Sequence, residues 1–206
     1  LKSVNDIFDP ALAGHVTLLT EMRDTLGLVM LGLGKDPTKA TVDDARAAAD
    51  KIQQFVGNDH IRAFTGNEYG DDLVRGDVWA AFAWSGDIVQ LQLENPDLTF
   101  LFPEEGFMLW SDNMMIPKKA AHKLAAETFM NFYYDPQVAA QVEASVQYIP
   151  PVEGTKEAIA EIDASLADNP LIFPDAATLA KANVFKPLDE EEEREMNELF
   201  QGLIGA

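Results

Sequence analysis

The sequence predicts an α/β fold built around a largely parallel sheet. Short apolar runs rich in β-branched residues recur along the chain, and most are followed by a segment with helical periodicity. Strands that alternate with helices of this length are typical of parallel sheets, because parallel neighbours need a crossover connection. A chain of 206 residues, 47% of them hydrophobic, is long enough to bury a core of this kind.

The first unit is a strand over residues 16–19 followed directly by a helix. The strand segment Val-Thr-Leu-Leu is mostly apolar and rich in β-branched residues, which indicates a buried strand. Thr20 is a candidate N-cap for the helix, and Glu21 and Asp24 fall in its first turn, where the helix dipole favours carboxylates. Two glycines near residue 33 end the segment.

The next elements are predicted from a capping pattern and from further apolar runs. Thr41 and Asp44 resemble a capping box and begin a helix that continues to about Phe55. A strand over 61–64 and a helix around 71–73 follow. The apolar run over 78–83 predicts a central strand buried on both faces, and further strands are predicted over 97–102, 107–110 and 113–117.

The last part of the chain predicts three more helices. One has apolar residues at helical spacing between Ala121 and Phe132, and the second begins at Asp135-Pro136 and ends near Ala144. The third begins in the acidic run after residue 188. Its apolar face consists of Met196, Leu199, Phe200 and Leu203.

Composition excludes several classes of function. The formal net charge of −20 argues against nucleic-acid binding and favours a cationic ligand, although many soluble proteins are acidic for solubility alone. The chain has no cysteine and no apolar run of membrane-spanning length. It begins without a signal peptide, so any targeting segment is expected outside this chain.

Motifs for catalysis are absent from the sequence. The chain has no nucleophile elbow, phosphate-binding loop, dinucleotide fingerprint or zinc-protease motif. Its three histidines, His15, His60 and His122, lie far apart and lack metal-ligand spacing. We therefore expect no enzymatic activity, no cofactor and no metal.

Several predicted strands are followed by carboxylates. In two of these places a tryptophan lies close to the acid. These groups are Trp84 with Asp87, Trp110 with Asp112, and the two acids Glu21 and Asp24. Ligands of open α/β sheets bind at the carboxyl ends of the strands, where aromatic faces and carboxylates would receive ammonium groups. The alternatives are that the tryptophans belong to the core and that the acids serve only as helix caps.

The sequence resembles the spermidine/putrescine-binding proteins of polyamine ABC importers. The resemblance runs in order through most of the chain. It is carried by HVTLLTEMRDTLGLVMLGLG, GDVWAAFAWSGD, PEEGFMLWSDNMMIPKKA and NFYYDPQVAAQVEASVQYIPPV. It implies a type II periplasmic-binding-protein fold, in which two lobes close around the ligand by a hinge motion.

The resemblance also implies the residues of the cleft. Trp84 and Trp110 match aromatic walls, Asp112 and Asp87 match carboxylates for amines, and Tyr148 matches a further aromatic. Asp24 matches a position usually filled by Glu, and an apparent one-residue deletion before Arg23 makes Glu21 a second candidate there.

By the same analogy, residues 1–98 and 152–206 form the second lobe, and residues 99–151 form the remaining part of an incomplete first lobe. The family's chains begin with a segment that this chain lacks, so we expect exposed apolar surface and a tendency to self-associate.

The expected function is capture of polyamines and their delivery to a membrane permease, outside the cytoplasm, with a lipid anchor left open. The alternatives are a binding protein of the same fold for iron, thiamine or another amine, and an enzyme or sensor lobe on this fold.

Overall fold

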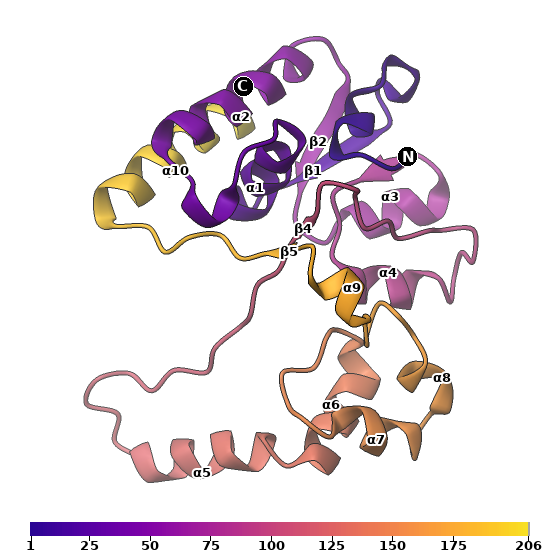
Figure 1. Ribbon diagram of the computed structural model, residues 1–206, viewed down its shortest axis with the longest axis vertical. Helices are drawn as coiled ribbons and strands as arrows, with labels where there is room; N and C mark the ends of the chain where they lie inside the picture. The colour runs from indigo at the N-terminus through magenta and orange to yellow at the C-terminus, as the bar shows by residue number, and fades with distance from the viewer. Residues whose placement is uncertain (206) are drawn as a thin grey trace. The chain divides into compact units, whose positions relative to one another are not determined.

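A computed structural model describes residues 1–205 of the protein (Figure 1). The chain divides into two compact units. We call residues 1–110 and 177–206 the sheet unit, and residues 111–176 the helical unit. These bounds differ from those of the expected lobes, residues 1–98 with 152–206 and residues 99–151, and the assignment to lobes stays a prediction.

The sheet unit contains a three-stranded parallel sheet with the order β2-β1-β3. Its strands are β1 (Val16–Leu19), β2 (Ile61–Thr65) and β3 (Ala80–Ala81). Leu19 pairs with Thr65, so β1 and β2 end at the same level of the sheet. All four residues of β1 are buried, as its apolar sequence predicts. The α/β class with a parallel sheet is therefore confirmed.

The strand predicted over 78–83 differs from the expectation in length and position. Only Ala80 and Ala81 form it, and within the described residues it lies at an edge of the sheet, with β1 in the centre. Burial alternates along the segment, since Val78 and Phe82 are buried whereas Trp79 is 58% exposed. The segment therefore has one buried face, and the prediction of burial on both faces is wrong.

Five helices accompany this sheet, on both of its sides (Figure 1). They are α1 (Met22–Gly32), α2 (Val42–Val56), α3 (Tyr69–Arg75), α4 (Ser85–Leu91) and α10 (Glu190–Ile204). α2 packs against both α1 and α10, and Met196, Phe200 and Leu203 of α10 are buried. The Thr41–Asp44 capping box of α2 is confirmed.

The N-cap of α1 is Glu21, which makes no side-chain capping bond, and not Thr20 as predicted. The Thr20 hydroxyl instead donates to Glu21 Oε2 at 2.9 Å, and the carbonyl oxygen of Thr65 is an alternative acceptor for the same proton at 3.4 Å. Short 3-10 helices also occur in this unit, over Val4–Phe8, Pro10–Leu12 and Pro37–Lys39.

A second parallel pair, β4 (Phe107–Met108) and β5 (Ala182–Asn183), completes the sheet unit. β4 confirms part of the strand predicted over 107–110. The strands predicted over 97–102 and 113–117 are wrong, because both segments are irregular. In the first segment, the Gln92 side-chain amide donates to the carbonyl oxygen of Leu98 at 2.8 Å. This carbonyl therefore bonds a side chain and not a neighbouring strand.

The helical unit contains short helices and a small buried core. Its helices are α5 (Lys123–Tyr133), α6 (Pro136–Val146), α7 (Thr155–Ala160) and α8 (Ala164–Ala167), and α9 (Ala176–Leu179) begins at its end. The core cluster consists of Ala140, Ala158, Ile159 and Ala167. Within the described chain, no residue of α5 is buried, although its sequence is amphipathic.

Candidate functional site

Side chains that follow all three strands of the main sheet meet at its carboxyl edge. Trp84, the N-cap of α4 after β3, donates from its indole Nε1 to Oδ2 of Asp24 in α1, at 3.1 Å. The backbone N–H of Trp84 donates to the hydroxyl of Tyr69, which follows β2, at 3.1 Å. That hydroxyl in turn donates to Asp87 Oδ2 at 2.6 Å. One hydrogen-bonded network therefore joins two acids and an indole from three segments.

Asp24 is the most desolvated acid of this network. Burial raises the pKa of Asp24 above its usual range, the Trp84 hydrogen bond lowers it in part, and the negative charge of Glu21 raises it further. Arg23, the adjacent cation, forms an ion pair with Glu193. Among residues 1–205, no Lys or Arg side chain forms an ion pair with Asp24. A cationic ligand would relieve this desolvation by supplying the opposite charge.

Asp87 is held by donors from a neighbouring segment. Tyr69 and the Asn67 side-chain amide, at 2.7 Å, both donate to its Oδ2. Two donors on one carboxylate oxygen fix the orientation of the group. Asp87 lies in the first turn of α4, but the side-chain bonds made by its carboxylate show that it does more than complement the helix dipole.

The sequence predicted Asp24, Trp84 and Asp87, and it missed Tyr69 and Asn67. Both follow β2 directly, so the rule used for the other strand ends also selects them. Glu21, the second candidate beside Asp24, is exposed and accepts the Thr20 hydroxyl.

The other three predicted residues lie elsewhere in the chain. Trp110 follows β4 at the end of the sheet unit and is 43% exposed. Asp112 is exposed and Tyr148 is half-buried, and both belong to the helical unit. The backbone of Tyr148 forms a hydrogen bond with the carboxylate of Glu143. The part of these three residues in a site stays a prediction.

Two of the histidines have structural partners. The His15 ring stacks on Trp79 with the centroids 3.8 Å apart, and its Nδ1 lies 2.8 Å from the carbonyl oxygen of Asp77. His60 is buried and bonds the carbonyl oxygen of Ile7. Across residues 1–205, no three His, Asp or Glu side chains are grouped so that they could hold a metal ion. The helices of the same region include none with the length and hydropathy to cross a bilayer.

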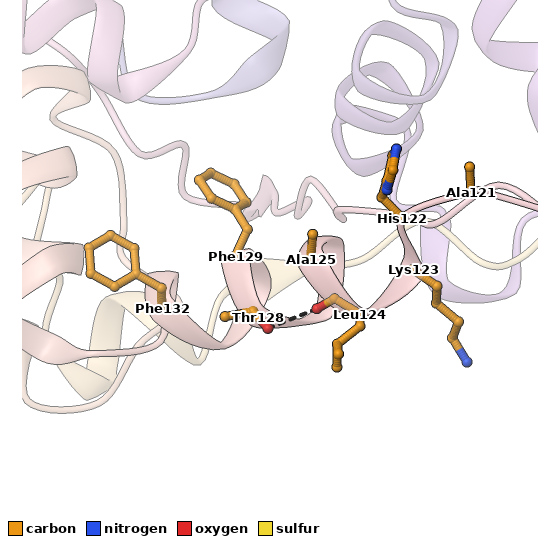
Figure 2. A pocket seen from close by; sticks show the side chains of 8 residues that line it. All are labelled: Ala121, His122, Lys123, Leu124, Ala125, Thr128, Phe129 and Phe132. Atoms are coloured by element: carbon orange, nitrogen blue, oxygen red, sulfur yellow. Dashed lines mark hydrogen bonds between the residues drawn. The ribbon is translucent and has the colours of Figure 1, made fainter.

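A shallow apolar surface lies on α5 in the helical unit (Figure 2). It is lined by Ala121, His122, Lys123, Leu124, Ala125, Thr128, Phe129 and Phe132, all from α5 and the residues just before it. Thr128 bonds the carbonyl oxygen of Leu124 at 2.8 Å and so serves the helix itself. No carboxylate lines this surface, so it lacks the groups that an amine needs.

Comparison with known proteins identifies relatives for most of the chain. Residues 1–174 match the family model described as bacterial extracellular solute-binding protein. The chain is 30% identical to the putrescine-binding periplasmic protein PotF of Escherichia coli, over 87% of this chain and 49% of that protein. It is 26% identical to a putrescine/cadaverine-binding protein of Pseudomonas aeruginosa, over 94% of this chain and 56% of that protein. The chain thus spans about half the length of the curated relatives it matches.

The fold has the same relatives. A putative spermidine/putrescine ABC transporter protein from Listeria monocytogenes superposes with a TM-score of 0.87 at 28% identity, over 98% of this chain and 61% of that chain. This likeness confirms the expected type II periplasmic-binding-protein fold. With the match over residues 1–174, it shows that the chain belongs to the family of bacterial extracellular solute-binding proteins.

Proposed function

We propose that the protein carrying this sequence is the polyamine-binding component of a bacterial ABC importer. It captures a polyamine and delivers it to a membrane permease, and it catalyses no reaction. The observation that carries the proposal is the hydrogen-bonded network of Asp24, Trp84 and Asp87 at the carboxyl edge of the parallel sheet.

The chemistry of this network matches an alkylammonium ligand. Carboxylates accept charge-assisted hydrogen bonds from an ammonium group, and an indole face attracts the cation and covers the adjoining methylene groups. A polyamine carries both kinds of surface in alternation. An anionic ligand would instead add negative charge beside Asp24, whose carboxylate is already desolvated.

The relatives support the choice of ligand. Their names specify putrescine, spermidine and cadaverine, all of which are flexible aliphatic amines. The formal net charge of −20 is consistent with such ligands, because an acidic field increases the rate at which cations are captured. The relatives named as periplasmic also support a location outside the cytoplasm.

The remaining predicted residues belong to the same proposal. Trp110, Asp112 and Tyr148 would supply a second aromatic wall, a carboxylate for another amine group, and a further aromatic. Glu21 stays a secondary candidate, because its exposed carboxylate can assist only from the rim.

The test is calorimetric titration of the full-length protein with putrescine, spermidine and cadaverine. Trp84→Ala removes the indole of the network, and we expect it to weaken binding by at least about tenfold, since aromatic and cation–π contacts of this kind contribute roughly 1–2 kcal/mol. Trp79→Ala is the matched control, because Trp79 lies at the other end of β3 and stacks on His15. Its affinity should equal that of the parent.

Two outcomes would contradict the proposal. In the first, the parent protein binds none of the three amines but binds thiamine or ferric iron. In the second, Trp79→Ala and Trp84→Ala weaken binding equally, which would show that the carboxyl-edge network is not the recognition site.

A further inference from the structure

Tyr69 is a fully buried tyrosine whose hydroxyl contacts two parts of the candidate site. It has 0% exposure and is the first residue of α3. Its hydroxyl donates to Asp87 Oδ2 at 2.6 Å and accepts the backbone N–H of Trp84 at 3.1 Å. A phenylalanine would fill the same buried volume, so packing alone does not explain the hydroxyl.

Asn67 acts on the same oxygen from the same segment. Its side-chain amide donates to Asp87 Oδ2 at 2.7 Å, and the side chain is exposed. The two donors approach one carboxylate oxygen from residues that follow β2, whereas Asp87 and Trp84 follow β3. β2 and β3 are not neighbours in the sheet, because β1 lies between them. These hydrogen bonds therefore connect two strand ends that the sheet itself does not pair.

We infer that Tyr69 and Asn67 are positioning residues for amine recognition, which hold the Asp87 carboxylate and the backbone of Trp84 in one arrangement. The inference rests on the proposed function, since it assigns these residues to the same site. Tyr69 matters most, because one buried hydroxyl orients both the acid and the aromatic residue. Its ring also packs near the indole, with the centroids 6.2 Å apart.

The network extends from Tyr69 to the second acid. Trp84, held through its backbone by Tyr69, donates from its indole to Asp24. Loss of the Tyr69 hydroxyl therefore acts directly on Asp87 and through Trp84 on Asp24. Neither effect requires contact between Tyr69 and the ligand, which is why Tyr69 is a positioning residue.

The test is a double-mutant cycle on the full-length protein, with putrescine affinity measured by calorimetry. Tyr69→Phe keeps the ring and removes both hydrogen bonds, and we expect about a tenfold loss of affinity. In an Asp87→Ala background, the same substitution should cost less than about threefold, because the acceptor of the Tyr69 hydroxyl is already removed. Thr155→Val is the matched control: it removes another buried hydroxyl, bonded to Val152 in the helical unit, and should leave affinity unchanged.

A second measurement needs no ligand. Hydrogen exchange of the Trp84 amide, followed by NMR, should be faster in Tyr69→Phe than in the parent, because the acceptor of that N–H is lost. The amides of β1 should exchange at the parent rate. This pattern supports positioning by Tyr69 even if the parent binds no amine, an outcome that would contradict the proposed function alone.

The inference is overturned by either of two results. One is an equal loss of affinity from Tyr69→Phe in the parent and Asp87→Ala backgrounds, or no loss in either. The other is Trp84 amide exchange that does not change, which would mean that the hydroxyl does not hold this segment.

Discussion

The sheet unit and the helical unit are built on cores of different kinds. The core of the sheet unit contains large aliphatic and aromatic side chains such as Leu18, Ile52 and Phe200, each almost fully buried. The core cluster of the helical unit consists of three alanines and Ile159. Large side chains bury more apolar area per residue and contribute more to the free energy of unfolding.

This difference bears on the two groups of candidate site residues. Asp24, Trp84 and Asp87 are joined by hydrogen bonds on a well-packed sheet, whereas Asp112 and Tyr148 lie on irregular segments of the helical unit. A site is more precise on strands and helices than on loops. We expect the sheet unit to hold its share of the ligand groups in place before the ligand arrives.

Removal of a core isoleucine from each unit should give the largest effect and the sharpest comparison. Ile52 and Ile159 are both 0% exposed. We expect Ile52→Ala to lower the free energy of unfolding by about 3–4 kcal/mol, and Ile159→Ala by about 2–3 kcal/mol, because a core of small residues leaves fewer contacts to lose. Urea denaturation measures both. A larger loss of unfolding free energy for Ile159→Ala than for Ile52→Ala would contradict the stated difference between the two cores.

We expect Glu143 to make the stability of the helical unit depend on pH. It is 3% exposed, and burial raises its pKa from 4.5 to about 7, against a lowering by the Tyr148 backbone hydrogen bond. Oε2 of Glu143 has no hydrogen-bond partner among the described residues. The folded state thus binds the proton more tightly than the unfolded state. Stability should fall as the pH rises from about 4.5 to 7, by about 2–3 kcal/mol in total.

Hydrogen exchange of α6 and α7 as a function of pH tests this prediction. Glu143→Gln should flatten the pH dependence, and Glu157→Gln, an exposed change on α7, should leave it as in the parent. A slope that persists in Glu143→Gln would assign the pH dependence to other groups.

Asp24→Asn should lower the affinity for putrescine and raise the free energy of unfolding. Because burial raises the pKa of Asp24 in the folded protein, its charge destabilises the fold at pH 7, and the uncharged amide should increase the free energy of unfolding. Putrescine affinity should fall by about tenfold, the value of one charge-assisted hydrogen bond. Asp43→Asn, an exposed acid of α2, should keep the parent affinity. Lower stability in Asp24→Asn would contradict the assigned cause.

Helix caps should give the smallest effect and the same size in both units, because capping is local. Thr41 accepts the N–H of Asp44 at the start of α2, and Asp135 accepts the N–H of Gln137 at the start of α6. We expect Thr41→Ala and Asp135→Ala each to cost about 1 kcal/mol of unfolding free energy. Urea denaturation measures both losses. If only one of the two substitutions lowers the unfolding free energy, the units differ in more than their cores.

Local signals predicted most of the sheet unit. The strands at 16–19 and 61–64, the capping box of Thr41 and the apolar face of the last helix depend on neighbouring residues alone, and all are present. The segment 97–102 fails because its apolar residues have β propensity but no strand ladder to join, and pairing depends on distant parts of the chain.

The part of the site that could be predicted follows from one rule, that ligands of open α/β sheets bind at the carboxyl ends of the strands. That rule selected Asp24, Trp84 and Asp87, which the structure joins by hydrogen bonds. The same rule covers the end of β2, but Tyr69 was passed over there, because a tyrosine at the start of a helix resembles an ordinary core residue. Its contact with Asp87 depends on the strand order β2-β1-β3, which brings the segments after β2 and β3 to the same edge of the sheet.

The β4–β5 pair gives the helical unit the character of an insertion. The chain leaves the sheet unit just after β4 and returns just before β5, and these strands lie side by side, with Leu109 N–H bonded to the carbonyl oxygen of Asn183 at 2.8 Å. Because the strands on either side of the helical unit are paired, we expect a flexible glycine–serine connector to be able to replace residues 111–176. The shortened chain would retain Asp24, Trp84, Asp87 and Tyr69, so that the part of the candidate site on the sheet unit could be measured without the helical unit.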